Sequence, residues 1–356
     1  MGMRSVKTKI ADVARQAGVS KSTISNYLNG RFESMSPKTR DKIEAAIQSL
    51  SYVPDITARR LSAKVRCNVI CLVIGFSFAE TFETVYYPTV MRQVGRAASE
   101  RGYRTLVYTR EGTRNREDME YLKGLSRSMA DGFMLFDLVE DDPYFRSFQE
   151  DGVPYVCVGK YDGTDDYHYV ATDHAGAIRQ AVDHLAELGH SRIGIMLEEG
   201  FSVVSVTRRR AFAEAMEARG LTARPEYVPT VPVHSVCRNE ESYRAFQRTM
   251  SMDIPPTAMI VPGNSIYQVE RIAAKLGKRI PEDLSLVIVD YSSASYTYHQ
   301  RNYTHLASRA GTVSEKAFNN LLAFIEHPEE GFVSEMVPTK LVVGDTTVSP
   351  AGYDAH

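Results

Sequence analysis

The sequence predicts an all-α head of helix-turn-helix type, followed by an α/β body with more than one core. In the first 66 residues, apolar positions recur at helical spacing. The remainder alternates short apolar runs with amphipathic stretches, the rhythm of parallel α/β folds. A chain of 356 residues is also long enough for two or three cores, so we expect a head and a bilobed body.

Charge is distributed unevenly between these two parts. Residues 1–66 hold thirteen Lys or Arg and five Asp or Glu, a net charge of +8, whereas the rest of the chain has a net charge of −10. A basic head on an acidic body is typical of a module that binds phosphates, because cationic side chains release counterions from a polyanion. A solvated basic face is the alternative that charge alone leaves open.

Composition excludes several other classes of protein. Hydrophobic residues make up 43% of the chain, yet no apolar run approaches a membrane span and no hydrophobic signal segment follows Met1. We therefore expect a cytoplasmic protein without a membrane partner. The cysteines show neither a CxxC pair nor a zinc-ligand spacing, so we expect buried thiols, no metal and no cofactor. The four are Cys67, Cys71, Cys157 and Cys237.

Two short helices joined by a tight turn are predicted near the start. Thr8 is placed to cap a first helix that Gly18 ends, and Ser20 to cap a second helix that runs from Lys21 to Asn29. Such a unit presents the outer face of its second helix to the major groove of DNA. Side chains near this face that can reach base edges or phosphates are Ser20, Lys21, Ser22, Thr23, Asn26 and Asn29.

A third helix completes the predicted head. Ser36 is its N-cap and Pro37 its first residue, and Ile43 and Ala46 belong to its apolar stripe. Thr39 and Arg40 lie in its first turn, where they suit phosphate contacts. A three-helix scaffold without DNA is the alternative, but cap, turn, core and basic face all agree on a DNA-binding head.

The segment from Lys9 to Ala63 resembles the head of the LacI/GalR family of bacterial transcription regulators. The matching motifs are Asp12-Val13-Ala14, Ala17-Gly18-Val19-Ser20, Thr23-Ile24-Ser25, Leu28-Asn29-Gly30, Thr39-Arg40 and Tyr52-Val53-Pro54. The resemblance implies a DNA-binding domain over residues 1–54 that binds a palindromic operator, with Thr8 and Tyr52 among the residues at the DNA.

The resemblance also implies a hinge helix and linker over residues 55–66 that enters the minor groove. Asp55 would cap this helix, Ala58 would pack, Arg59 and Arg60 would lie near phosphates, and Leu61 would be the wedge that opens a base step.

Two features depart from the family pattern. Asn26 replaces the usual Arg, and the loop from Asn29 to Ser36 is one residue longer than is common. Asn prefers adenine where Arg reads guanine, so we expect an operator that differs from the family's common half-site.

The body is expected to contain parallel, doubly wound sheets. Its apolar runs are Val69 to Ile74, Arg104 to Tyr108, Gly132 to Phe136, Tyr155 to Val158, Ile193 to Leu197, Ala258 to Val261 and Leu286 to Val289. The order of elements continues the LacI/GalR resemblance, which implies a periplasmic-binding-protein-like sensor over residues 67–349. By that resemblance one lobe covers about 67–170 and 307–333, and the other about 171–306 and 334–349.

The resemblance places an effector between the lobes, at the carboxyl ends of the strands. The corresponding residues are Tyr87, Val90, Phe136, Gly159, Lys160, Arg208, Gly263, Asp290 and Ser308. Arg208 and Asp290 suit sugar hydroxyls, because they offer bidentate hydrogen bonds. For the aromatic residues, ordinary lobe core is the alternative.

Several effector positions depart from the family pattern. The chain has Pro262-Gly263-Asn264 where Asn-Asp is usual, Tyr291 where a second Asp is usual, and Arg301 to His305 in place of Pro-Pro-Leu-Thr-Thr. Lys160 is similar to the residue of regulators that bind maltose-like sugars. The sequence therefore leaves open the effector, the operator, and whether the effector releases or promotes DNA binding.

The expected function is a transcription regulator that acts as a repressor. We expect it to bind DNA as a homodimer and to respond to a sugar or sugar derivative. A nucleoside effector, a solute-binding protein and an enzyme are the alternatives. Against an enzyme, no GxSxG, P-loop, GxGxxG or HExxH motif occurs. For His168, His174, His184 and His190, solvent exposure is expected rather than metal binding. A dimer is expected because no heptad tail follows Val348.

Overall fold

The computed structural model describes residues 8–28, 31–32, 35–52, 66–75, 77, 81–82, 86–109, 116–137, 143–160, 166–198, 203–231, 243–292, 301–331 and 334–351. The chain forms two compact units, residues 1–68 with 124–130, and residues 69–123 with 131–356. We call residues 8–52 of the first unit the head, and the second unit the body. Within the described residues, no helix is long and apolar enough to cross a membrane.

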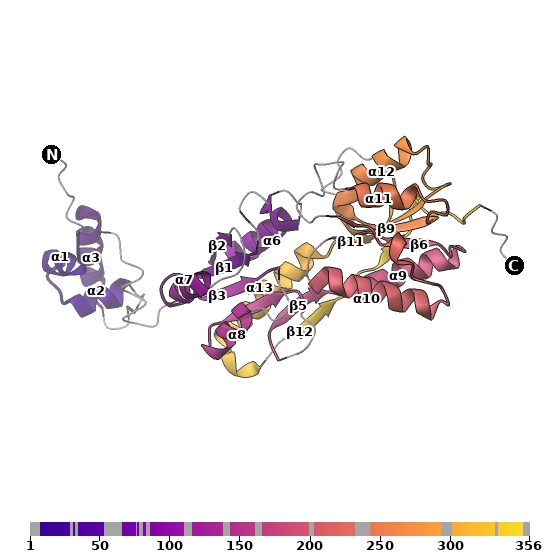
Figure 1. The fold of residues 1–356 in the computed structure, drawn as a ribbon. Helices are drawn as coiled ribbons and strands as arrows, with labels where there is room; N and C mark the ends of the chain where they lie inside the picture. The colour runs from indigo at the N-terminus through magenta and orange to yellow at the C-terminus, as the bar shows by residue number, and fades with distance from the viewer. Residues whose placement is uncertain are drawn as a thin grey trace. The chain divides into compact units, whose positions relative to one another are not determined.

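The head is a three-helix domain, drawn in indigo in Figure 1. Its helices are α1 (Ile10–Ala17), α2 (Lys21–Leu28) and α3 (Pro37–Ser49). Gly18 adopts φ 67°, a left-handed conformation that ends α1 and that glycine reaches without strain. Small and branched side chains from all three helices fill the core: Val13, Ala14, Ala17, Ile24, Met35, Ile43 and Ala46.

The predicted caps of the head are confirmed at two helices and wrong at the first. The Oγ atoms of Ser20 and Ser36 accept hydrogen bonds from the backbone N–H groups of Thr23 and Thr39, at 3.1 and 3.2 Å. Helix α1 instead begins after Lys9, whose N–H donates to Asp12 at 3.0 Å. Thr8 does not cap it, because its hydroxyl donates to the carbonyl of Leu50 at 3.3 Å and so ties the two ends of the head together.

The first sheet of the body has six parallel strands in the order β12-β5-β4-β3-β1-β2. They are β1 (Val69–Ile74), β2 (Arg104–Thr109), β3 (Gly132–Leu135), β4 (Tyr155–Val158), β5 (Tyr169–Thr172) and β12 (Ser334–Val337). The helices that accompany this sheet are α6 (Tyr86–Glu100), α7 (Arg116–Ser128), α8 (Pro143–Glu150) and α13 (Ala310–Glu326). Helices α6 and α13 pack together over one core (Figure 1).

The second sheet has five strands in the order β13-β11-β10-β9-β6, all parallel except for the pair of β11 and β13. They are β6 (Ile193–Ile195), β9 (Ala258–Pro262), β10 (Ser285–Tyr291), β11 (Thr304–Ala307) and β13 (Leu341–Val342). Helices α9 (His174–Glu187) and α10 (Val203–Ala218) pack on one core, and α11 (Arg244–Met250) and α12 (Ile266–Lys275) on another. Strands β7 (Leu197–Glu198) and β8 (Thr230–Val231) pair with each other and form a separate, two-stranded parallel sheet.

Three 3₁₀ turns complete the described elements: Pro225–Tyr227, Gly263–Ser265 and Pro328–Glu330. The seven predicted strands are all present, with ends that shift by a few residues. One placement differs from the sequence analysis, which assigned residues 334–349 to the second lobe. Residues 334–337 form β12 and pair with β5, so the sheet of the first lobe includes them.

The expected exposure of the histidines is wrong for His168 and His190, which are 3% and 2% exposed. His190 Nδ1 lies 2.8 Å from the hydroxyl of Thr257, and Nε2 donates to the carbonyl of Val348 at 2.9 Å. Since a carbonyl only accepts, Nε2 carries the ring proton. His190 therefore anchors the last described segment of the chain to the second sheet. The expected burial of the thiols is confirmed for Cys71 and Cys157, whereas Cys67 is half-buried and Cys237 lies outside the described residues.

Replacing His190 with alanine is expected to lower the free energy of unfolding of the body by about 2–3 kcal/mol, because it leaves buried polar partners unpaired. Urea unfolding followed by circular dichroism measures this change. His184→Ala is the control, since His184 is half-buried and its ring makes one hydrogen bond, to Thr347 at 3.0 Å. Equal losses in the two variants would contradict an anchoring role for His190.

Candidate functional site

Hydroxyl groups gather at the N-terminal end of α2. Ser20 Oγ lies 2.6 Å from Ser22 Oγ and 2.8 Å from Thr23 Oγ1, and Lys21 and Ser22 are exposed. Asn26 is half-buried in the second turn of the same helix, two residues before the helix ends at Leu28. The predicted recognition residues of this helix therefore share one short element, which is the arrangement that base reading requires.

Arg40 has a structural role that the sequence analysis did not foresee. Its Nη2 atom donates to the carbonyls of Phe32 and Met35, at 3.3 Å each, and its guanidinium lies 4.7 Å from the centroid of the Phe32 ring. These contacts fix Phe32 and Met35, which lie in the loop that is one residue longer than the family pattern. The predicted phosphate contact of Arg40 would thus use a side chain that is already fixed by its own loop.

The remaining predicted DNA contacts are divided between described and undescribed residues. Thr39 and Tyr52 are half-buried, and Tyr52 packs against the core of the head. Asn29 and the hinge residues Asp55, Ala58, Arg59, Arg60 and Leu61 lie outside the described residues. The hinge therefore stays a prediction from the sequence.

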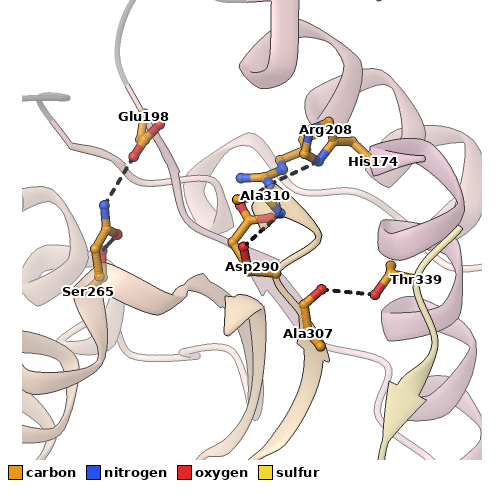
Figure 2. Close-up of polar contacts among 10 residues, drawn as sticks. His174, Glu198, Arg208, Ser265, Asp290, Ala307, Ala310 and Thr339 are labelled. Carbon is orange, nitrogen blue, oxygen red and sulfur yellow. Dashed lines mark hydrogen bonds and ion pairs between the residues drawn. The ribbon is translucent and has the colours of Figure 1, made fainter. Parts of the chain in front are cut away.

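In the body, Arg208 and Asp290 are joined directly, as Figure 2 shows. Arg208 of α10 donates from Nη2 to the carboxylate of Asp290, at the end of β10. The same Nη2 lies 3.1 Å from Nδ1 of His174, the first residue of α9. The side chain of Arg208 is 7% exposed and that of Asp290 is 43% exposed. The pair therefore presents its carboxylate, and not its guanidinium, to solvent.

The electrostatics of this triad fix its protonation. Burial, together with the charge of Arg208, lowers the pKa of His174 to about 4, although Asp290 and Asp173 oppose the shift. His174 is thus neutral at pH 7, and because Arg208 can only donate, Nδ1 accepts and Nε2 carries the proton. Burial raises the pKa of Asp290, but the charge of Arg208 and the hydrogen bond from its guanidinium outweigh burial and leave the pKa of Asp290 below its usual value.

A second aspartate occupies the corresponding place in the first lobe. Asp137 follows β3 as Asp290 ends β10, and the two have φ angles of 55° and 56°. Left-handed backbone is strained for residues other than glycine and is concentrated at functional sites. Asp137 accepts a hydrogen bond from the N–H of Gly75 at 2.9 Å and another from the hydroxyl of Tyr87.

The aromatic pair Tyr86 and Tyr87 lies within electrostatic reach of both lobes. Their ring centroids are 5.0 Å apart. Burial raises the pKa of Tyr86, and the charges of Asp137 and then Asp290 raise it further. Burial also raises the pKa of Tyr87, followed by Asp137 and, more weakly, Glu198. Charged residues of both lobes therefore influence the ionisation of this pair.

The other predicted effector residues have mixed environments. Val90 and Phe136 are 0% and 1% exposed and belong to the core of the first lobe. For Phe136, lobe core is the alternative that the sequence left open. Lys160 Nζ lies 5.6 Å from the centroid of the Tyr169 ring, and the N–H of Gly159 donates to Val170 at 3.0 Å. Gly263 is buried at the start of a 3₁₀ turn. The N–H of Ser308 donates to the carbonyl of Tyr291 at 2.7 Å, and its hydroxyl accepts from the N–H of Ala310 at 3.4 Å.

Sequence reasoning did not assign four polar residues to the effector site: His174 of the triad, and Asp137, Glu198 and Asn264. Asn264 Nδ2 lies 3.5 Å from Glu198 Oε1. Asp137 follows a predicted strand directly, a position like that of Asp290, and this signal could have identified it. His174 could not be placed in this way, because the preceding strand β5 was not predicted. Within the described residues, no group of three or more His, Cys, Asp or Glu side chains could hold a metal ion.

A helix-turn-helix head on a chain whose body holds two parallel α/β sheets defines a class of protein, the DNA-binding regulators with a periplasmic-binding-protein-like domain. Residues 9–55 match the model of the bacterial regulatory proteins of the lacI family, and residues 182–347 that of the periplasmic binding protein-like domain. The transcriptional regulator CelR of Thermobifida fusca is 32% identical over 290 residues, which cover 80% of this chain and 82% of CelR. The chain therefore belongs to the lacI family.

Solved structures show the same fold. The complex of the transcriptional regulator CelR with cellobiose has a TM-score of 0.67 at 26% identity, and covers 95% of this chain and 99% of the other. The lac repressor dimer bound to operator and the anti-inducer ONPF has a TM-score of 0.80 at 22% identity, with coverage of 96% and 100%. The similar relative is a transcriptional regulator and not an enzyme, so this chain is a transcription regulator with a DNA-binding head.

Proposed function

We propose that this regulator is a homodimeric repressor of the cytoplasm whose operator affinity is controlled by a sugar or sugar derivative bound between the lobes of its body. The triad of Arg208, Asp290 and His174 carries the proposal. It combines a buried guanidinium with a partly exposed carboxylate at a strand end, and the charge of that carboxylate also raises the pKa of Tyr86 in the other lobe. Such fixed donors and acceptors suit the bidentate hydrogen bonds of sugar hydroxyls.

A thermal-shift screen of the purified protein tests the effector class, because a ligand that binds the folded state raises the melting temperature. Cellobiose is the first compound to test, since the similar CelR was solved with it. Other disaccharides, nucleosides and sugar phosphates follow. A nucleoside that stabilises the protein while no sugar does would support the alternative effector class. A compound that binds should also change the gel shift of DNA from the gene's own upstream region.

Asn26→Ala is expected to lose discrimination at one base pair of each half-site, at a cost of about 1–3 kcal/mol, because an asparagine amide can form two hydrogen bonds with adenine. Gel shifts on operator variants with single base-pair changes measure the loss. Lys21→Ala is the control on the same helix, and it is expected to weaken all DNA sequences alike through a lost phosphate contact. Equal weakening of operator and random DNA by Asn26→Ala would show that Asn26 only positions the backbone.

A further inference from the structure

Two carboxylates join the same pair of strands, β1 and β3, at opposite ends of the first sheet. Asp131 directly precedes β3, and its Oδ2 atom accepts a hydrogen bond from the N–H of Val69, the first residue of β1, at 3.3 Å. Asp137 follows β3, and its Oδ2 atom accepts from the N–H of Gly75, directly after β1, at 2.9 Å. Because β1 and β3 are parallel neighbours, each carboxylate fastens one end of the pair.

The contact at Asp137 extends beyond the two strands. Its second carboxylate oxygen accepts a hydrogen bond from the hydroxyl of Tyr87, which lies on α6. The backbone of Asp137 is left-handed, with a φ of 55°. Such a conformation is strained for aspartate and persists only where the surrounding contacts over-determine it. At this end of the strands, one strained residue therefore connects β1, β3 and the first turn of α6.

Tyr87 is held both by its ring and by its hydroxyl. The ring packs edge to face against Phe136, with centroids 6.3 Å apart, and the side chain is buried in the core of the first lobe. Burial, followed by the charge of Asp137, raises the pKa of Tyr87, so the phenol keeps the proton that it donates to Asp137. Two consecutive residues at the end of β3 thus fix the position of one tyrosine on the neighbouring helix.

The orientation of Tyr86 depends in turn on that of Tyr87. The two rings lie at 90° to each other with centroids 5.0 Å apart, an edge-to-face geometry that aromatic pairs prefer. Tyr86 is half-buried, whereas Tyr87 is buried, so Tyr86 is the more exposed ring of the pair. The contact of Asp137 with Tyr87 therefore also constrains the ring that is more open to solvent.

The second lobe contains a similar arrangement. Asp290 ends β10 with a φ of 56°, and its carboxylate accepts a hydrogen bond from Arg208 of α10. In each lobe, a left-handed aspartate at the carboxyl end of a strand holds a large side chain from a helix. Ligands of parallel α/β folds bind at this end of the strands, and side chains that are already ordered lose less entropy on binding.

We propose that Asp137 is a positioning residue of the effector site, whose carboxylate holds Tyr87, and through it Tyr86, in the orientation that binds the effector. This inference rests on the proposed function, since it requires that an effector binds between the lobes. Without the carboxylate, the ladder between β1 and β3 remains, but the two tyrosines lose the contact that orders them. The effector must then order the pair itself, and its affinity falls.

A tryptophan reporter tests the ordering of the pair without any ligand. The chain contains no tryptophan, so Tyr86→Trp introduces a single reporter. Asp137→Gly removes the carboxylate and adds no strain, because glycine adopts left-handed backbone freely. In the reporter protein, Asp137→Gly is expected to raise the acrylamide quenching constant at least about twofold, because groups released from their contacts open to solvent more often. Asp131→Gly is the matched control, and it should lower the melting temperature without changing the quenching.

Calorimetric titration of the full-length protein tests the effect on affinity. The probe is cellobiose or, if cellobiose does not bind, the compound that gives the largest thermal shift. Asp137→Gly is expected to raise the Kd at least about tenfold, the loss that one charge-assisted hydrogen bond can produce. In a Tyr87→Phe background the same substitution should change the Kd by less than about twofold, because residues that act through one contact are not additive. Asp137→Asn, which keeps one acceptor oxygen, should fall between Asp137→Gly and the parent.

An unchanged Kd in Asp137→Gly, or quenching that Asp137→Gly and Asp131→Gly raise equally, would overturn the proposal and leave the effector site itself intact. An equal increase in Kd with and without the hydroxyl of Tyr87 would show that Asp137 acts through another residue, which also overturns it. If the parent protein binds none of the screened compounds, the proposed function is contradicted, and the role of Asp137 with it.

Discussion

Asp290→Ala is expected to abolish the response of operator binding to the effector, while the free protein keeps its operator affinity. The carboxylate is the exposed acceptor of the triad, and its loss also leaves the buried guanidinium of Arg208 without its ion pair. A ligand shifts a conformational equilibrium only through its differential affinity for the two states. Without the acceptor, that differential affinity is lost, whereas the head keeps its own core and DNA contacts.

The measurement is a gel shift of operator DNA with increasing concentrations of the compound found by thermal shift. Asp290→Asn is the matched variant, because the amide keeps an acceptor oxygen for Arg208 but not the charge. We expect it to retain more of the stability of the body than Asp290→Ala and to respond only at higher effector concentrations. An Asp290→Ala protein that responds at the same concentration as the parent would show that the effector binds elsewhere.

The second large effect concerns pH. Burial lowers the pKa of His168 to about 4, and the ring packs 4.1 Å from the centroid of Phe324. As the pH falls below about 6.5, the unfolded chain binds a proton at this position before the folded protein does. The contribution of the neutral His168 ring to the free energy of unfolding is therefore fully present above about pH 6.5, and it is lost as the pH falls from that value to about 4.

Through His168, the parent protein is expected to lose about 2–3 kcal/mol of its free energy of unfolding on acidification. His168→Phe is expected not to lose this amount, because phenylalanine does not titrate and can keep the ring contact with Phe324. Urea unfolding at pH 7.5 and at pH 4.5 in both proteins gives the difference; these values bracket the titration range of a histidine. His327→Phe is the control, because His327 is exposed at the end of α13. Identical pH dependence of His168→Phe and the parent protein would show that His168 is not held neutral in the fold.

The head could be predicted almost entirely from the sequence, because its signals are local. Ser20 and Ser36 cap helices within a few residues of themselves, and Gly18 ends α1 through its own φ angle. Thr8 was assigned wrongly since its partner, Leu50, lies 42 residues away. A sequence pattern of helix caps contains no information about a contact at that separation.

In the body, the strands were predictable and their partners were not. The apolar runs that form β1, β4 and β9 are distinct in the sequence. Strands β5 and β12 were not predicted, and they pair with each other at a separation of 165 residues. The same limit applies to the triad. Arg208 and Asp290 were selected through the family resemblance, but nothing local to His174 indicates that it meets an arginine on another helix.

Two strands drawn from the far end of the chain set the order in which this protein can fold during synthesis. The first sheet is complete only when residues 334–337 join it, and the second only when residues 341–342 pair with β11 and Val348 reaches His190. On the ribosome, the head can fold as soon as residue 52 has emerged, because its core is local. Both lobes must wait until residues 334–348 have been synthesised, so their partly built sheets expose unpaired edges until then. The DNA-binding part of the molecule is therefore assembled before the part that regulates it.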